Sequence, residues 1–481
     1  MTALRRTLLL ALFCLVAGTA ALAPVASAGT RAGPLETGIF DPDVFYPGSP
    51  LAFDRVREAG AHYARIWVSW RGLAPDHMPS SGDPSDPEDP VWDYHWASLD
   101  QAVTDAVDAG LEPVLLIFAT PRWAAQVSAC KSDVCAPDPA EYADFAHAVA
   151  ARYDGRTDGV PRVRYFQAWN EANIHPFFLP QFAGGQTVSP EIYRSMLNFF
   201  SGAVKDVNPG NLVITSGLAP LKRPGSVAPL EFMRQMLCMH GRRHPRRVCP
   251  AEARFDIWST HPYTPGSPVR HGYGPDDTTI ADLPKMTRLL RAAERQGAIR
   301  TDLDRVPFWV TEFSWDTKGP DPEGVPLWRH ARWTAEALYR MWRAGVSNVF
   351  WFQLRDQPGD GAPPDIFQSG LYFRGDTLAD DRPKPALHAF HFPFVALPEG
   401  AAVQVWGRTP DSEPGWVRIQ VRTLFGWETK ATLFADRFGI FRSTLRLRRG
   451  GVARAVYEGR RSTNFWIKPT RNVFQRPFGR L

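Results

Sequence analysis

Two glutamates, Glu171 and Glu312, each stand at the end of a short apolar run of the chain. Glu171 lies in the sequence Trp-Asn-Glu-Ala-Asn at 169–173, and Glu312 lies in Val-Thr-Glu-Phe at 310–313. A pair of carboxyl groups can share one reaction, because a protonated acid can protonate a leaving oxygen while an ionised carboxylate attacks a carbon. A single glutamate is usually a solvated surface charge, but two that close apolar strands in this way predict a catalytic pair.

The segments that must position this pair alternate between strand-like runs and helical patterns over residues 33–396. The strand-like runs are apolar on both faces, as buried parallel strands are. They cover residues 37–40, 64–70, 113–119, 164–169, 212–216, 255–260, 308–311 and 346–352. Between them, apolar residues recur at helical spacing, for example at 142–149, 193–200, 230–237 and 335–342. The repeat predicts an α/β fold of the (β/α)8, or TIM-barrel, type. A doubly wound open sheet is the alternative, but no glycine-rich phosphate-binding turn follows the first run.

Long irregular segments follow several of the strand-like runs. Segments 71–93, 263–282, 316–326 and 355–369 would all rim the carboxyl-terminal face of a barrel, where active sites of this fold lie. Strands four and seven face each other across that mouth. Their two carboxyl groups could therefore flank one glycosidic bond of a bound sugar.

The Asn170-Glu171 pair at the end of strand four, with Glu312 at the end of strand seven, resembles the clan A retaining glycoside hydrolases. The resemblance covers most of residues 33–396 by topology and is specific in a few short motifs. It implies that Glu171 is the general acid/base and Glu312 the nucleophile. Asn170 would hydrogen-bond a sugar hydroxyl beside the reacting carbon. The sequences of these motifs are most similar to those of the xylosidase/iduronidase family and of cellulase-like members. Residues 118–121 lack a histidine that some cellulases place nearby, so the identity of the substrate stays open.

Four further positions match the same clan. Arg65 on strand two resembles the arginine that supports the nucleophile, and His261 with Tyr263 resembles its His-x-Tyr element. Tyr263 would then hydrogen-bond Glu312 and help to keep it ionised. Trp351 on strand eight resembles the aromatic floor on which a sugar stacks. The alternatives are an arginine that pairs with a structural acid, a core histidine and a core tryptophan. No metal or cofactor is expected, because the sequence has neither His-x-His on strand one nor an HExxH motif.

The pattern changes after residue 396. Apolar and polar residues alternate at 417–422 and 445–448, and short runs separated by Gly and Pro predict a small antiparallel β-sandwich over 397–481. This segment holds 16 basic and 6 acidic residues. Such a balance suggests an anionic cell-surface or wall polymer as a partner, and a solvated arginine face is the alternative. No interleaved aromatic pattern points to nucleic acid.

The first 28 residues predict a secretory signal peptide. Arg5 and Arg6 precede an apolar stretch at 8–16, and Ala26-Ser27-Ala28 has the form of a cleavage site. Four cysteines remain after this segment, at 130, 135, 238 and 249, and an even number in an exported chain predicts two disulfides. Three pairings are possible, and proximity favours 130 with 135 and 238 with 249. No apolar run in the mature chain is long enough to span a membrane.

The sequence therefore predicts a secreted protein with a signal peptide at 1–28, a barrel at 29–396 and a sandwich at 397–481. Composition agrees with a globular chain, since 44% of the 481 residues are hydrophobic and 22% are charged. The leading hypothesis is a retaining glycosidase that acts on O-glycosidic, β-linked sugars of a polysaccharide, oligosaccharide or glycoconjugate. The alternative is a catalytically inactive glycan-binding protein on the same barrel. Transglycosylation would need the same residues and differ only in the acceptor.

Overall fold

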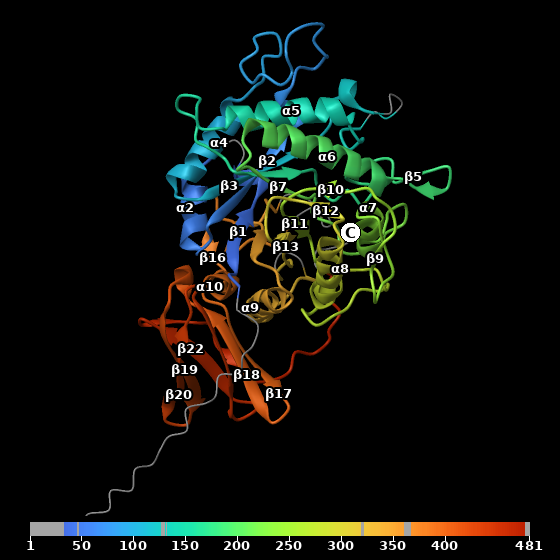
Figure 1. Ribbon diagram of the computed structural model, residues 1–481. Coiled ribbons are helices and arrows are strands. Elements are labelled where there is room, and N and C mark those ends of the chain that lie inside the picture. The colour runs from blue at the N-terminus through green and yellow to red at the C-terminus, as the bar shows by residue number, and fades with distance from the viewer. Residues whose placement is uncertain are drawn as a thin grey trace, which may run out of the picture. The chain divides into compact units, whose positions relative to one another are not determined.

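The computed structural model describes residues 33–45, 48–126, 130, 132–318, 322–359 and 367–476, so the predicted signal peptide lies outside the described residues. A parallel sheet of eight strands, in the order β11-β13-β14-β1-β2-β3-β4-β7, forms the centre of the fold (Figure 1). Its strands are β1 (Glu36–Phe40), β2 (Tyr63–Ser69), β3 (Glu112–Phe118), β4 (Tyr165–Ala168), β7 (Leu212–Ile214), β11 (Trp258–Thr260), β13 (Phe308–Phe313) and β14 (Asn348–Phe352). All eight lie within or next to the predicted runs.

The two edge strands of this sheet meet and close it into a barrel. Ile214 and Ile257 form a parallel bridge, and the backbone N–H of Thr215 donates to the carbonyl of Ile257 at 3.0 Å. Strand β11 begins three residues later than the predicted run, and the carboxylate of Asp256, rather than a carbonyl, accepts the backbone N–H of Val213 at 2.9 Å. The predicted (β/α)8 barrel is confirmed.

A helix follows each barrel strand, as the repeat pattern predicts. These helices are α2 (Pro50–Glu58), α4 (Ala97–Asp108), α5 (Pro139–Arg152), α6 (Ser189–Val207), α7 (Pro229–Met236), α8 (Leu283–Arg295), α9 (Leu327–Arg343) and α10 (Pro385–His391). Their apolar stripes pack against the outer faces of the strands, where most of the buried core lies.

Shorter elements fill the connections. They are α1 (Pro42–Phe45), α3 (Trp70–Leu73), the single 3₁₀ turns η1 (Arg122–Ala124), η2 (Ile280–Asp282) and η3 (Pro410–Ser412), and the two-residue strand pairs β5 (Phe182–Ala183) with β6 (Gln186–Thr187), β8 (Met239–His240) with β9 (Arg246–Arg247), β10 (Ala253–Arg254) with β12 (Ile299–Arg300), and β15 (Tyr372–Phe373) with β16 (Arg382–Pro383).

The barrel interior is layered. A lower layer is apolar and includes Val114, Ile214, Ile257, Trp309 and Phe350, and the ring centroids of Trp309 and Phe350 lie 5.7 Å apart. Because side chains of a strand alternate between its two faces, the next inward positions lie two residues further along each strand. On β2, β4, β11 and β13 these positions are polar, and they form the floor of the barrel mouth.

The C-terminal part folds into two antiparallel sheets, drawn in orange and red in Figure 1. One contains β17 (Phe394–Glu399), β18 (Ala402–Arg408) and β21 (Ile440–Leu445), and the other β19 (Gly415–Thr423), β20 (Gly426–Ala435), β22 (Val452–Tyr457), β23 (Arg460–Arg461) and β24 (Phe465–Trp466). Along β19, Val417 and Ile419 are fully buried whereas Arg418 and Arg422 are exposed, which confirms the predicted alternation. The predicted β-sandwich is present.

The sandwich and the barrel share buried contacts. Arg408 of β18 is fully buried and donates to the carbonyl of Leu35 at 2.8 Å and to the hydroxyl of Thr37 at 3.2 Å, both on or next to β1. Trp406 packs against Tyr339 and Trp342 of α9. The chain from Gly33 onward forms one compact unit, and the boundary between 396 and 397 stays a prediction.

Two disulfides join Cys130 with Cys135 and Cys238 with Cys249, so the pairing that proximity favours is confirmed. Disulfides of this kind are typical of chains that fold in an oxidising compartment. Within the described ranges, the helices are all too short or too polar to cross a membrane.

Candidate active site

Glu171 reaches the barrel mouth through a sharp turn at the end of β4. Trp169 and Glu171 have positive φ angles of 72° and 42°, a left-handed conformation that is unfavourable for residues with a side chain. Packing fixes this turn, since the buried ring of Trp169 donates through Nε1 to the carbonyl of Phe177 at 2.7 Å. The backbone N–H of Glu171 donates to the carbonyl of Ser216 at 2.9 Å, beyond the end of β7. Such strain is commonly stored at functional sites.

Glu312 faces the mouth because β13 departs from regular pairing. Trp309 and Thr311 point inward, so strict alternation would turn Glu312 outward. The register of β13 against β14 shifts between Val310 and Phe313, which is the mark of a β-bulge. A bulge re-aims one side chain, and bulges are frequent next to active sites. Glu312 thereby joins the inward set, and only 8% of its surface remains exposed.

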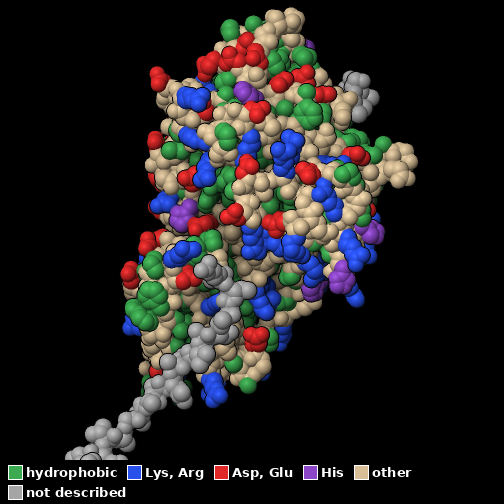
Figure 2. Space-filling view, in the orientation of Figure 1, with side chains coloured by type: hydrophobic (Ala, Val, Ile, Leu, Met, Phe, Trp, Pro, Cys, Tyr) green, Lys and Arg blue, Asp and Glu red, His purple; other side chains and the backbone are tan. Residues whose placement is uncertain are grey.

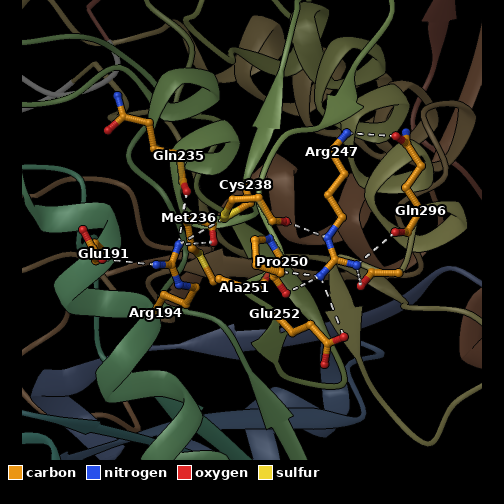
Figure 3. The surroundings of a disulfide bond; sticks show 12 residues. Glu191, Arg194, Gln235, Met236, Cys238, Arg247, Pro250, Ala251, Glu252 and Gln296 are labelled. Atoms are coloured by element: carbon orange, nitrogen blue, oxygen red, sulfur yellow. Dashed lines mark hydrogen bonds and ion pairs between the residues drawn. A yellow bond between two sulfur atoms is a disulfide. The ribbon is translucent and has the colours of Figure 1, made fainter.

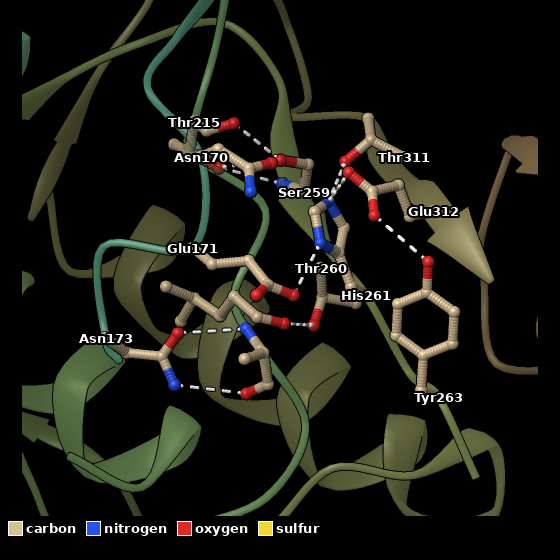
Figure 4. A network of polar contacts seen from close by, with 12 residues as sticks. Asn170, Glu171, Asn173, Thr215, Ser259, Thr260, His261, Tyr263, Thr311 and Glu312 are labelled. Atoms are coloured by element: carbon tan, nitrogen blue, oxygen red, sulfur yellow. Dashed lines mark hydrogen bonds and ion pairs between the residues drawn. The ribbon is translucent and has the colours of Figure 1, made fainter. Parts of the chain in front are cut away.

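His261 lies between the two carboxyl groups (Figure 4). Its Nδ1 is 2.9 Å from Oε1 of Glu171, and its Nε2 is 3.0 Å from Oγ1 of Thr311 and 3.7 Å from Oε1 of Glu312. The imidazole is fully buried, and Glu171 is 7% exposed. Two carboxyl groups that are 141 residues apart in the chain therefore meet around one ring, as the sequence predicts for strands four and seven.

Arg65 holds Glu312 from the other side. Its Nη1 is 2.5 Å from Oε1 of Glu312, its Nη2 donates to Oδ1 of Asn170 at 3.1 Å, and its Nε donates to Oε1 of Gln167 at 2.7 Å. The guanidinium is fully buried and stacks 4.3 Å above the ring of Phe40. One cation thus contacts side chains from β4 and β13, which is the arrangement that the predicted support of Glu312 by Arg65 would need.

The surroundings of Glu312 favour its ionised form. Burial raises the pKa of this carboxyl, but electrostatic interactions with His261 and Arg65 and hydrogen bonds from Arg65 and Tyr263 lower the pKa further than burial raises it. The hydroxyl of Tyr263 donates to Oε2 of Glu312 at 3.0 Å. Burial, together with the charge of Glu312, raises the pKa of Tyr263 well above its usual range, so the phenol keeps its proton and remains a donor.

Asn170 presents its amide toward the mouth. Because Oδ1 accepts from Arg65, the amide N–H groups are left to donate to a ligand. Asn173 has a different task, since its amide donates to the carbonyls of Ala219 and Val227 and its Oδ1 accepts from Ala219. It ties the turn after β4 to the loop after β7.

Gln167 is a member of the site that the sequence argument did not single out. Its Nε2 donates to the carbonyl of Thr215 at 2.8 Å and lies 3.3 Å from Oγ of Ser259, while its Oε1 accepts from Arg65. The sequence did contain a signal for this residue. Gln167 is a polar residue in an otherwise apolar, buried strand, and a buried polar side chain needs hydrogen-bond partners.

The structure does not bring Trp351 to the mouth, which corrects the expected aromatic floor. Its ring is fully buried against Phe313, His330 of α9 and Phe390 of α10, and its Nε1 donates to the carbonyl of Ser369. Since Phe350 points into the barrel, alternation turns Trp351 toward the helices.

The neighbouring inward positions supply aromatic rings instead. Phe352 follows Phe350 on the inward face of β14 and lies 5.8 Å from the ring of Phe40. Trp67 follows Arg65 on the inward face of β2, is half-buried, and stacks parallel to Phe40 with centroids 6.3 Å apart. Counting every second residue along each strand from a known inward position would have identified both rings from the sequence.

Metal ligation is not built into the described part of the chain. Among the residues that the structure describes, no group of three or more His, Cys, Asp or Glu side chains is arranged to hold a metal ion. The arrangement around Glu171 and Glu312 can instead do proton transfer and nucleophilic attack with side chains alone.

Known structures share this fold. The chain is similar to a family 39 glycoside hydrolase from Bacteroides cellulosilyticus WH2, with a TM-score of 0.51 and 18% identity over 86% of this chain and 79% of that one. It is also similar to a monomeric β-xylosidase from Caulobacter crescentus CB15, with a TM-score of 0.50 and 16% identity over 87% of this chain and 95% of that one.

Comparisons by sequence, unlike the comparison of structures, find no match. No known protein-family model matches the chain, and no curated protein sequence matches it. At 18% and 16% identity the two similar structures establish the fold and nothing finer. The chain thus has the barrel architecture of these two enzymes, and its chemistry must be argued from its own residues.

Proposed function

We propose that this protein is a retaining glycoside hydrolase, with Glu171 as general acid/base and Glu312 as nucleophile. The observation that carries the proposal is the unequal setting of two carboxyl groups around His261. Glu312 accepts from Arg65 and Tyr263, whereas His261 is the one side chain hydrogen-bonded to that of Glu171 among the described residues. Environments that differ in this way assign different roles to two carboxyl groups.

In the first step, the ionised carboxylate of Glu312 attacks the anomeric carbon. The bond from that carbon to the leaving oxygen breaks, and Glu171 transfers its proton to this oxygen. A covalent glycosyl ester on Glu312 results. The donors Arg65 and Tyr263 fix the carboxylate in place before the attack, so little reorganisation is needed.

In the second step, Glu171 accepts a proton from water, which attacks the same carbon and displaces Glu312. Two displacements at one carbon give net retention of configuration. The amide of Asn170 is suited to donate to a sugar hydroxyl beside the reacting carbon, and Trp67 with Phe352 offers an apolar face against which a sugar can stack. By the resemblance to the clan A retaining enzymes, the proposed substrate is an O-linked, β-configured glycoside of a polysaccharide, oligosaccharide or glycoconjugate.

A panel of 4-nitrophenyl β-glycosides tests this proposal. The protein is expected to hydrolyse at least one of them, and Glu312→Gln should reduce turnover by about a thousandfold or more, because the nucleophile is lost. Glu171→Gln should slow glycosides of poor leaving groups far more than dinitrophenyl glycosides, which need no proton. Glu191→Gln is the matched control, since that side chain is 84% exposed. Failure to hydrolyse any member of a broad panel would instead favour the inactive glycan-binding protein.

Export belongs to the same proposal. A signal peptide at 1–28 and two disulfides support release into an oxidising, extracellular space, where glycans are found. Within the mature chain, residues 29–396 would form the catalytic part and 397–481 an accessory module. Cleavage after Ala28 is read directly by N-terminal sequencing of the secreted protein.

A further inference from the structure

The longest run of basic residues on the barrel lies in a hairpin outside the carboxylate site. Residues 240–247 read His-Gly-Arg-Arg-His-Pro-Arg-Arg and contain no acid. They span β8, a turn and β9, and the disulfide between Cys238 and Cys249 closes the base of the hairpin. Neither the barrel nor the proposed hydrolysis requires this charge.

Hydrogen bonds tie the hairpin to the end of α8 (Figure 3). Arg247 donates to the carbonyls of Cys249 at 3.0 Å and Gly297 at 2.5 Å, and the amide of Gln296 donates to the carbonyl of Pro245 at 3.0 Å. Arg247 therefore serves the local structure rather than a ligand. A platform that is already ordered loses little entropy when it binds.

Three of the remaining cations are presented to solvent, whereas the side chain of Arg234 is 14% exposed and Lys285 pairs with Asp282 at 2.8 Å. Arg243, Arg246 and Arg288 of α8 are exposed, and none of them has a carboxylate within 4.0 Å in the described parts of the chain. Arg242 and Arg234 share the carboxylate of Asp276, at 2.7 and 3.0 Å, which orients both guanidinium groups. Positive charge thus exceeds negative charge across this region.

Two hollows flank the turn of the hairpin. One has a volume of about 700 Å³ and the other about 360 Å³, and both are lined by Arg234, Gly241, Arg242 and Arg243. The smaller hollow extends to Lys285 and Arg288. Figure 2 shows Lys, Arg and His side chains gathered over α8 and β9, with few acidic ones among them.

We propose that this basic surface, consisting of Arg234, Arg242, Arg243, Arg246, Lys285 and Arg288, binds an acidic polysaccharide. Guanidinium groups pair with carboxylate or sulfate through two parallel hydrogen bonds, and a polymer presents such groups repeatedly. The two hollows share Arg242 and Arg243 in their lining, and neighbouring hollows of this kind suit successive sugar units. Among the described residues, no Trp, Tyr or Phe lines either hollow, so these residues do not offer the stacking on which single-stranded nucleic acid relies.

This proposal is independent of the hydrolytic one. The basic surface consists of residues from α7, the β8–β9 hairpin and α8, whereas Glu171 and Glu312 lie at the ends of β4 and β13. It also differs from the expectation that the basic C-terminal module is the anionic contact. Binding can therefore be measured whether or not a glycoside is cleaved.

Binding of the full chain to immobilised polygalacturonate and dextran sulfate tests the proposal, with neutral dextran as the blank. We expect binding to both acidic polymers at low ionic strength and its loss with added salt, because exposed charges are screened. A variant with Arg243→Gln, Arg246→Gln and Arg288→Gln should bind at least about tenfold more weakly, since three unpaired cations are removed. Its thermal unfolding and any aryl glycoside hydrolysis should be unchanged.

The matched control removes three exposed arginines of the sandwich, by Arg418→Gln, Arg422→Gln and Arg446→Gln. It should bind the acidic polymers like the unchanged protein. Loss of binding in this control instead, or equal binding by both variants, would overturn the proposal. So would equally tight binding to single-stranded DNA or to phosphatidylserine vesicles, which would mark a surface for polyanions in general.

Discussion

Arg65 and Glu312 form a buried ion pair across the barrel mouth, with Nη1 and Oε1 2.5 Å apart. The guanidinium is fully buried, and its other nitrogens donate to Gln167 on β4 and to Asn170 in the turn after β4, so the same cation also positions these two residues of the site. Breaking a buried pair on one side is strongly destabilising, because it leaves the other charge without compensation. The pair therefore controls both the charge of Glu312 and the geometry around it.

Removal of this cation should change the pH dependence of activity. In Arg65→Gln, burial raises the pKa of Glu312 with less opposition, so the acidic limb of kcat/KM should move up by about 1 to 3 pH units. In the unchanged protein that limb should lie below pH 4.5, the ordinary value for Glu, since the pKa of Glu312 is lowered. Rates between pH 3 and 8 measure the shift. Arg71→Gln, an exposed position, is the control, and an unmoved limb in Arg65→Gln would contradict the assignment of Glu312.

The same ion pair should also affect stability in a pH-dependent way. Because the pKa of Glu312 is lower in the folded state, its stabilising contribution is present above pH 4.5 and is lost as the pH falls through the lowered value. Arg65→Gln should cost about 3 to 5 kcal/mol at neutral pH and less in acid. Urea unfolding at pH 7 and pH 4 measures the difference. A loss of unfolding free energy that is larger at pH 4 than at pH 7 would contradict the prediction.

Tyr263 should assist Glu312 through one hydrogen bond. Tyr263→Phe removes the donor to Oε2 and should lower kcat/KM by about 10- to 100-fold, since hydrogen bonds to charged groups contribute about 1.5 to 3 kcal/mol. The acidic limb should rise at the same time. Tyr273→Phe provides a control, because that side chain is 68% exposed, and equal effects of the two substitutions would argue against a specific role.

Substitutions of Trp351 and Trp67 should have different effects, one on stability and the other on substrate binding. Trp351→Phe leaves a gap between β14, α9 and α10 and should lower the free energy of unfolding by about 1 to 3 kcal/mol with KM unchanged. Trp67→Ala should instead raise KM, because it removes an aromatic face at the mouth. Kinetics and urea unfolding of both variants decide the matter. If KM increased for Trp351→Phe and not for Trp67→Ala, Trp351 would be the aromatic residue that contacts the sugar, as first predicted from the sequence.

The sandwich should unfold together with the barrel. Arg408→Met removes donors to the carbonyl of Leu35 and the hydroxyl of Thr37 and should cost about 1 to 3 kcal/mol, because buried acceptors lose their partners. Calorimetry should give one transition for the unchanged protein and a lower midpoint for the variant. Arg418→Met, on the exposed face of β19, should leave the midpoint unchanged. Two separate transitions in the unchanged protein would mean that the sandwich is independent.

Much of the barrel could be predicted because its strands are apolar on both faces and its helices carry regular stripes. Strand order predicted that Glu171 and Glu312 end the fourth and seventh barrel strands. Trp351 was placed at the mouth by a resemblance that did not take account of the alternation of side chains along β14. Because Phe350 points into the barrel, Trp351 points away from it. The inward turn of Glu312 depends on a bulge that no local pattern announces.

Long-range contacts explain the rest of what the sequence left open. Gln167 became part of the site only when β2 and β4 placed it beside Arg65. The contacts between Arg408 and the start of β1 join residues more than 370 positions apart, which no local pattern reveals. The basic hairpin was visible as a run of arginines, but its rigidity depends on Gln296 and Gly297 of a distant helix end.

The stereochemistry of the first product tests the central claim most directly. An aryl β-glycoside that the protein cleaves is followed by proton NMR within the first turnovers, before the free sugar mutarotates. Attack by Glu312 and then by water predicts the β-anomer as the initial product. Initial release of the α-anomer would mean a single displacement by water, and would contradict the role of Glu312 as nucleophile.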